Sequence, residues 1–194
     1  ASAWAGEEES RVRLIAGQTG VGDGKNVELG FQFSLQPGWK IYWRSPGDAG
    51  LPPEFDWSGS ENLAGTEVFW PAPKRYSAYG LDSIGYEDEV VLPIIAELNA
   101  AGQPLDLKVR LDYLICKDVC IPRRAALALL LPKGPPAPTD FGQEIARYLE
   151  KVPGRGNRPD FGIERVEGIG SLAEPRLRVV ARSTLPFDEA AVSI

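Results

Sequence analysis

The chain has 194 residues and is acidic, with a formal net charge of −6 at pH 7 and a pI near 4.9. An acidic chain without a run of Lys or Arg releases no phosphate counterions, which argues against nucleic-acid binding. The sequence contains no histidine, which excludes Ser-His-Asp and Cys-His catalysis and histidine-ligated zinc, so any chemistry must come from thiols, carboxylates, lysine or tyrosine.

The first 132 residues contain short segments of alternating apolar residues, separated by turns rich in Gly and Pro. Eight such segments lie at residues 11–16, 27–35, 39–44, 55–57, 66–70, 90–98, 105–111 and 124–132. Residues 45–53 are too rich in proline and glycine for regular structure. Residues 74–89 are polar, contain three tyrosines and are expected to form a loop. This pattern predicts an all-β fold, an antiparallel β-sandwich.

The composition changes after residue 132. Prolines crowd residues 132–138, which predicts a linker, and Thr139 or Asp140 can begin a short amphipathic helix. Residues 161–166 and 176–183 predict two extra strands. We therefore expect a β domain at 1–132, a linker with a short helix at 133–158, and the start of a second β domain at 159–194.

The only two cysteines, Cys116 and Cys120, are separated by three residues. A straight strand would place their Cα atoms about 13 Å apart, whereas a disulfide needs about 4.4–6.8 Å. If the two pair, the chain must leave its strand at Cys116 and turn at Lys117-Asp118. Pro122 is expected to prevent the strand from resuming directly, since it has no N–H to donate.

Three roles are open for this pair. A local structural disulfide would contribute only about 2 kcal/mol through so short a loop, and a chain of this length buries its own core. A functional dithiol is therefore favoured over a staple. A half metal site would need carboxylates or a second chain to complete it, because the sequence also lacks methionine. We expect no metal and no cofactor.

The segment 113–122, Tyr-Leu-Ile-Cys-Lys-Asp-Val-Cys-Ile-Pro, resembles the active-site segment of the periplasmic N-terminal domain of the DsbD/ScsB (suppressor of copper sensitivity) family of transmembrane thiol:disulfide reductases. Residues 37–53, 70–73 and 84–93 also resemble the ScsB branch. The resemblance covers residues 10–132 and implies an immunoglobulin-like sandwich with a redox-active disulfide.

The resemblance also implies roles for individual residues. Cys120 would form the mixed disulfide with a partner, and Cys116 would resolve it. A cap over the pair would correspond to the segment 76–86, with Tyr76, Tyr79 and Tyr86, and Tyr42 matches an aromatic lining position. The sequence departs from the family in one respect: Tyr76-Ser77-Ala78 stands before Tyr79-Gly80, where the family has an acidic pair.

The family implies an electron-transfer role in the periplasm, as a soluble domain of an inner-membrane protein. A thioredoxin-like domain of the same full-length protein would supply the electrons. Exported thioredoxin-fold or peroxiredoxin-like proteins would accept them, which makes the activity that of a protein-disulfide reductase, linked in this branch to copper tolerance. The membrane would be reached only through a separate transmembrane domain.

Thiol exchange needs a thiolate, and a free cysteine has a pKa of about 8.5. Lys117 and Arg123, with the neighbouring Arg124, are candidates for lowering the thiol pKa, while Asp118 would raise it. The alternative function is a redox-inert β-sandwich that binds carbohydrate or protein and carries a structural disulfide. A reduction potential well above about −300 mV would favour exchange.

Overall fold

A computed structural model describes residues 1–78, 80–154, 160–171 and 173–184 of the chain. The chain divides into two compact units, Ala1–Pro153 and Gly154–Ile194, and each is described by itself.

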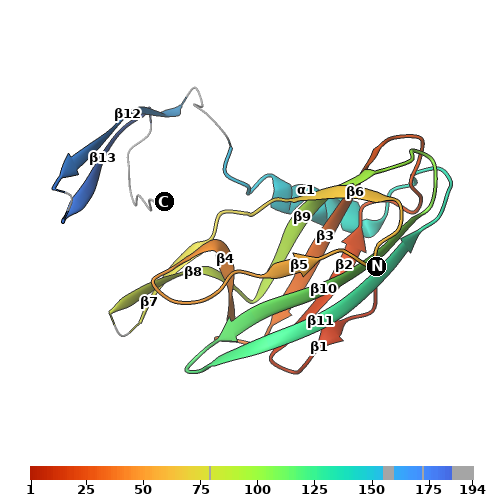
Figure 1. Ribbon diagram of the computed structural model, residues 1–194, viewed down its shortest axis with the longest axis horizontal. Coiled ribbons are helices and arrows are strands. Elements are labelled where there is room, and N and C mark those ends of the chain that lie inside the picture. The colour runs from red at the N-terminus through yellow and green to blue at the C-terminus, as the bar shows by residue number, and fades with distance from the viewer. Residues whose placement is uncertain (79, 155–159, 172, 185–194) are drawn as a thin grey trace. The chain divides into compact units, whose positions relative to one another are not determined.

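The first unit consists of two antiparallel sheets (Figure 1). The first sheet has the strand order β1-β2-β3-β9-β6: Ala5–Gly6, Ser10–Ala16, Asn26–Leu35, Glu89–Leu98 and Leu63–Val68. The second has the order β11-β10-β4-β8-β7: Cys120–Leu131, Leu105–Cys116, Lys40–Gly47, Leu81–Glu87 and Lys74–Ala78. The short strand β5, Glu54–Asp56, also pairs with β10.

The core lies between the two sheets, where alternate residues of each strand are buried. Phe33 of β3 packs edge-on against Tyr113 of β10, with ring centroids 5.5 Å apart. Phe31 stacks on Phe55 of β5 at 4.7 Å. The predicted all-β, immunoglobulin-like antiparallel sandwich is confirmed.

The helix α1, Asp140–Leu149, covers the opposite face of the first sheet. Gly30 makes room for it, because a Cβ there would lie 2.7 Å from Val91 and 3.4 Å from Ile145 of the helix. The predicted Pro-rich linker is also hydrogen-bonded to the sandwich, for example through the Thr19 N–H and the Ala137 carbonyl at 2.8 Å. Residues 133–153 therefore lie in the first unit, although the sequence suggested a separate linker and helix at 133–158. Within the described residues, no helix has the length and apolar character needed to cross a membrane.

The second unit contains one hairpin, β12 (Phe161–Gly170) and β13 (Pro175–Ser183), in the region where two strands were predicted. Its register shifts between Ile163 and Arg165, and this irregularity keeps Ile163 and Val166 opposite Ala181 and Val179 on one face. The other face carries ion pairs such as Arg165–Glu167 at 2.9 Å. The hairpin is therefore amphipathic.

Three local predictions were wrong. Residues 45–53 were expected to lack regular structure, but Ser45, Pro46 and Gly47 continue β4. The segment 74–89 is not a loop, because it forms the β7–β8 hairpin and the start of β9. Pro122 does not stop the strand, since β11 begins at Cys120 and continues through Pro122, which pairs with Leu114. The strand β11 is at the edge of its sheet, where proline is tolerated if its nitrogen points away from the neighbouring strand.

Candidate functional site

The two cysteines face each other at the end of the β10–β11 hairpin. Cys116 is the last residue of β10 and Cys120 the first of β11, and the two are in register across a three-residue loop. Their Cα atoms are 4.1 Å apart, close to the about 4.5 Å of a non-hydrogen-bonded antiparallel pair. They form a disulfide. The turn after Cys116 thus brings the two sulfurs together, as the spacing required.

The two sulfurs differ in their access to solvent. Cys116 is only 2% exposed, whereas Cys120 is exposed. Both belong to the face of the second sheet that is turned away from the core, here called the outer face, because their neighbours Ile115 and Ile121 pack into the core or against it. An outside molecule can therefore reach Cys120, while Cys116 is covered by the protein.

Tyr42 lies beside the cysteine pair. It alternates with the core residues Ile41 and Trp43, so its ring lies on the outer face, and it is 3% exposed. Its hydroxyl lies 3.9 Å from the Cys120 sulfur. Burial raises the pKa of Tyr42 above its usual range, so the hydroxyl stays protonated where thiols titrate. Tyr42, which the resemblance implied as a lining residue, is thus in contact with Cys120.

The loop 48–53, which follows β4, holds the Tyr42 ring in place. Gly50 has a φ of +110°, and a Cβ there would lie 2.2 Å from the ring. The backbone at Gly50 thus approaches the ring more closely than any side chain would allow. At the other end of the loop, Asp48 accepts a hydrogen bond from the Asp82 N–H of the β7–β8 hairpin at 2.9 Å. The loop is ordered by these contacts.

Two of the three predicted cap tyrosines fall on opposite faces. Tyr76 of β7 lies under the ammonium of Lys40, which is 4.9 Å from the ring centroid. Burial, with a contribution from the carboxylates of Glu87 and Asp88, raises the pKa of Tyr76 above its usual range. Tyr86 of β8 instead packs in the core, where its hydroxyl donates to the Pro71 carbonyl at 2.8 Å.

Tyr79, the third predicted cap residue, lies outside the described residues. The structure therefore brings Tyr42, Cys116 and Cys120 together and turns Tyr86 away from them.

The charged residues beside the cysteines are engaged elsewhere. The ammonium of Lys117 donates to the Pro37 carbonyl at 3.5 Å. Arg123 forms ion pairs with Glu7 at 2.7 Å and Glu9 at 2.6 Å, so its charge is compensated by two carboxylates. Asp118 is exposed in the hairpin loop.

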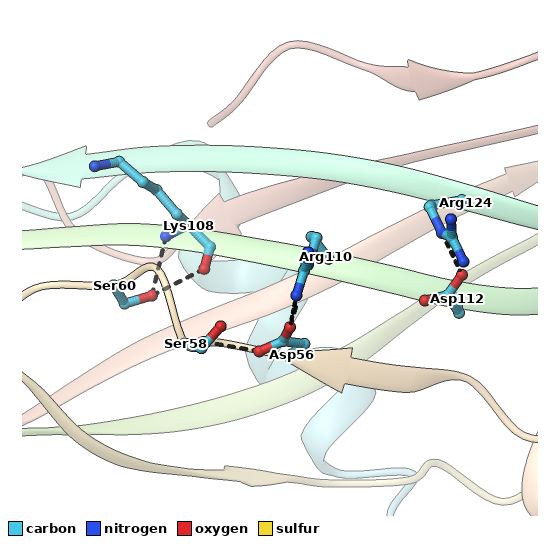
Figure 2. A network of polar contacts seen from close by, with 7 residues as sticks. All are labelled: Asp56, Ser58, Ser60, Lys108, Arg110, Asp112 and Arg124. Atoms are coloured by element: carbon cyan, nitrogen blue, oxygen red, sulfur yellow. Dashed lines mark hydrogen bonds and ion pairs between the residues drawn. The ribbon is translucent and has the colours of Figure 1, made fainter.

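A polar network on the outer face of β10 was not foreseen from the sequence. Figure 2 shows Asp56 paired with Arg110 and Asp112 paired with Arg124, the latter at 2.7 Å. The Ser60 hydroxyl exchanges hydrogen bonds with the backbone of Lys108 at 3.0 Å. The hydrogen bond from Arg110 holds the pKa of Asp56 well below its usual range. The network fixes β5 and the following turn to the cysteine hairpin.

A small cleft lies along the same hairpin, two positions from the cysteine pair. It has a volume of about 170 Å³ and is lined in part by Leu51, Pro52, Leu114 and Pro122. Leu114 and Pro122 are the pair two positions from Cys116 and Cys120, and therefore share their face. Among the described residues, no three Cys, Asp or Glu side chains gather as a metal site would require.

The fold and the site together define a class: a β-sandwich thiol–disulfide exchange domain, with its cysteine pair at the tip of an edge hairpin. The family described as thiol:disulfide interchange protein DsbD, N-terminal, matches residues 12–132, which is more than half of the chain. The chain belongs to this family.

Two solved structures match this chain. The crystal structure of the N-terminal periplasmic domain of ScsB from Proteus mirabilis matches with a TM-score of 0.64 and 23% identity, over 99% of this chain and 88% of that one. The two share a fold. The reduced DsbD N-terminal domain of Neisseria meningitidis matches with a TM-score of 0.36 and 17% identity, over 66% of this chain and 90% of that one. No curated protein matches the sequence.

Proposed function

We propose that this domain passes reducing equivalents to partner proteins through Cys116 and Cys120, with Cys120 as the residue that reacts with the partner. The observation that carries the proposal is the difference in access, since Cys120 is exposed and Cys116 is 2% exposed. Thiol–disulfide exchange requires in-line attack on a sulfur, so the sulfur that meets a second protein must be reachable.

The exchange runs in two balanced steps. The Cys120 thiolate attacks one sulfur of the partner's disulfide, forming a mixed disulfide and releasing the partner's other sulfur as a thiolate. The Cys116 thiolate then attacks the Cys120 sulfur, which restores the internal disulfide and releases the partner's second thiolate. The partner gains two electrons, and this domain loses two.

The partners follow from the family. We propose a thioredoxin-like domain of the same full-length protein as the electron donor, and exported thioredoxin-fold or peroxiredoxin-like proteins as acceptors. The enzyme would then be a protein-disulfide reductase that works in the periplasm as a soluble part of an inner-membrane protein. The similarity to a periplasmic domain supports this location.

The β7–β8 hairpin and the loop 48–53 would act as the cover of the pair. The hydrogen bond between Asp48 and the Asp82 N–H joins the two segments, and Tyr42 lies beneath the loop. This cover would keep a partner from Cys116, so that the partner meets Cys120 first. We also propose, on the amphipathic hairpin of the second unit, that residues 159–194 belong to a second β domain.

The test is the reduction potential of the Cys116–Cys120 pair, measured by equilibration with glutathione buffers and thiol alkylation. A value well above about −300 mV is expected for an exchange domain. A potential below that range would make the disulfide structural and would favour a redox-inert binding module.

Partner trapping tests the order of attack. Cys116→Ala leaves the reactive sulfur without its resolving neighbour and is expected to accumulate a mixed disulfide with a partner. Cys120→Ala is expected to accumulate none. The reverse pattern would assign the roles the other way round.

A further inference from the structure

A row of four residues crosses the second sheet at the disulfide. Cys120 of β11 is in register with Cys116 of β10, Cys116 with Lys40 of β4, and Lys40 with Glu87 of β8. Residues that are directly opposite in antiparallel strands share a face, with their Cβ atoms about 4.5–5.5 Å apart. The covered sulfur of Cys116 therefore lies between the exposed sulfur of Cys120 and a lysine.

The side chain of Lys40 is held on this face by the β7–β8 hairpin. Its ammonium lies over the Tyr76 ring at 4.9 Å from the centroid, and the residue is half-buried. Among the described residues, no carboxylate oxygen lies within 4.0 Å of this ammonium, the limit for an ion pair. Because Tyr76 belongs to β7, this contact holds the ammonium on the β8 side of its own strand, and no carboxylate neutralises it by direct contact.

The other charged and titratable groups near Cys116 are differently arranged. In the hairpin loop, Lys117 is directed to the Pro37 carbonyl and Asp118 is exposed. On β4 the protonated Tyr42 hydroxyl contacts Cys120. Further along the hairpin, Arg124 is paired with Asp112.

On the far side of Lys40 lie Glu87 of β8 and the adjacent Asp88, whose charges reach Tyr76. Of the cations on this face in the described chain, Lys40 is the one in register with Cys116.

We propose that the Lys40 ammonium stabilises the thiolate of Cys116 and so accelerates the resolving step. The inference rests on the proposed function, in which Cys116 attacks the Cys120 sulfur of the mixed disulfide. In that step the Cys116–Cys120 bond forms as the bond to the partner breaks, and the partner's sulfur leaves as a thiolate. A nearby cation favours the charged form of the attacking thiol and increases the fraction ready to react.

The first test isolates Cys116 in a Cys120→Ser background and follows its ionisation by the ultraviolet absorbance of the thiolate, with the variant lacking both thiols subtracted. Lys40→Gln is expected to move the titration to higher pH, and Lys40→Arg to restore it. The matched control Lys117→Gln, a lysine at the same hairpin that points to a carbonyl, is expected to have a smaller effect. An unchanged titration in Lys40→Gln would overturn the proposal.

A second variant keeps the test decisive if Lys40→Gln does not fold. Glu87→Gln removes the carboxylate on the far side of the lysine and is expected to move the Cys116 titration to lower pH. A shift to higher pH in this variant would contradict the proposal.

The second test measures the resolving step in the chain with both cysteines. The reduced protein reacts with an aromatic disulfide that releases a coloured thiolate, once when Cys120 attacks and again when Cys116 resolves. Lys40→Gln is expected to slow the second release about threefold at neutral pH, since a tenfold smaller thiolate fraction is partly offset by the greater nucleophilicity of a more basic thiol. Equal second-phase rates would contradict the proposed role.

These results are separable from the proposed function. A structural disulfide would show itself in the reduction potential, whatever the thiolate titration gives. If the pair is redox-active but Lys40→Gln leaves the Cys116 titration unchanged, only the role of the lysine is refuted.

Discussion

The roles proposed for the two cysteines agree with their positions in the sheet, since Cys120 is in the edge strand and Cys116 in the next strand inward. Both sulfurs lie on the outer face, yet Cys116 has strands β4 and β11 on either side, while Cys120 begins an edge strand with no neighbour beyond it. The exposure of Cys120 is therefore a consequence of its position at the sheet edge. An exposed sulfur at an edge and a covered sulfur one strand inward are suited to attack and resolution, respectively.

The contact between the Tyr42 hydroxyl and the Cys120 sulfur predicts a pH effect. In a Cys116→Ser background, Tyr42→Phe removes a donor that favours the Cys120 thiolate, so its alkylation should require higher pH and slow by about twofold to fivefold at neutral pH. At alkaline pH the two rates should converge. Tyr86→Phe is the control, because its hydroxyl lies in the core on Pro71. An equal change in both variants would show that the effect is not specific to this contact.

The close approach of Gly50 to Tyr42 predicts a stability effect. Gly50→Ala would place a methyl group on the ring at a φ of +110°, whereas Gly134→Ala, at a φ of +148°, meets no atom within 4 Å. Both variants bear the cost of the backbone conformation, but only the first also has the clash. We expect Gly50→Ala to lower the free energy of unfolding by at least about 1 kcal/mol more than Gly134→Ala, measured by urea unfolding of the oxidised protein. Equal losses would mean that the ring moves freely.

At the residue scale, the sequence revealed the parts of the site that lie close together in the chain. The turn between Cys116 and Cys120 follows from their spacing, and Tyr42 was found by resemblance. Lys40 was missed because its register with Cys116 joins strands far apart in sequence, and no local pattern encodes that pairing. The inward position of Tyr86 could have been predicted, because Ile84 and Tyr86 alternate with Ser83 and Gly85 as core residues of a strand do.

At the scale of elements, Arg123 joins the edge hairpin to the first sheet. It faces inward opposite Tyr113, and its guanidinium binds Glu7 and Glu9 on either side of the turn between β1 and β2. Its side chain is only 14% exposed. The residue thus links the two sheets where the sandwich is open.

This arrangement predicts that Arg123→Ala destabilises the domain. We expect a loss of about 1–3 kcal/mol in urea unfolding of the oxidised protein, because the change breaks two charged hydrogen bonds at a mostly covered site. Arg124→Ala is the matched control: its side chain is 77% exposed and has one carboxylate partner, so its loss should be within about 0.5 kcal/mol. Similar losses in both variants would mean that the Arg123 ion pairs are no stronger than a surface pair.

The β7–β8 hairpin shows why one element was misread. Its strands have tyrosines, glycines and charged residues in place of a regular apolar alternation, because much of the hairpin is exposed. β7 has no buried residue, and β8 alternates only over Ile84 and Tyr86, so the segment shows little of the periodicity by which strands are recognised. Its strand structure depends on pairing with β4, which no local pattern predicts.

For the whole molecule, the fold class could be predicted because most strands of a sandwich have one buried and one exposed face. The position of residues 133–153 within the first unit could not be predicted from the sequence. The prolines were correctly recognised as non-strand, but their backbone groups bond to the segment 17–22, and the helix that follows covers the first sheet. A composition typical of linkers does not show whether the backbone finds partners.

The division of the chain predicts how it tolerates truncation. A fragment of residues 1–153 should keep the reduction potential of the cysteine pair and the urea midpoint of the sandwich, because it contains the whole first unit. A fragment of residues 1–132 should be markedly less stable, since it loses Ile145 and Tyr148 of α1, which are 2% and 9% exposed. Burial of each such side chain contributes about 1.5–3 kcal/mol, so the two losses remove a large part of a domain's usual stability.

The measurement is urea unfolding of both fragments and the full chain, followed by tryptophan fluorescence in the oxidised state. Equal midpoints for 1–132 and 1–153 would show that the helix is dispensable. A lower midpoint for 1–153 than for the full chain would show that the second unit stabilises the first. We expect unequal midpoints for 1–132 and 1–153, because α1 covers Gly30 and Val91 on the first sheet and residues 133–139 are joined to the first unit by backbone hydrogen bonds. We expect equal midpoints for 1–153 and the full chain, because residues 1–153 contain the whole first unit.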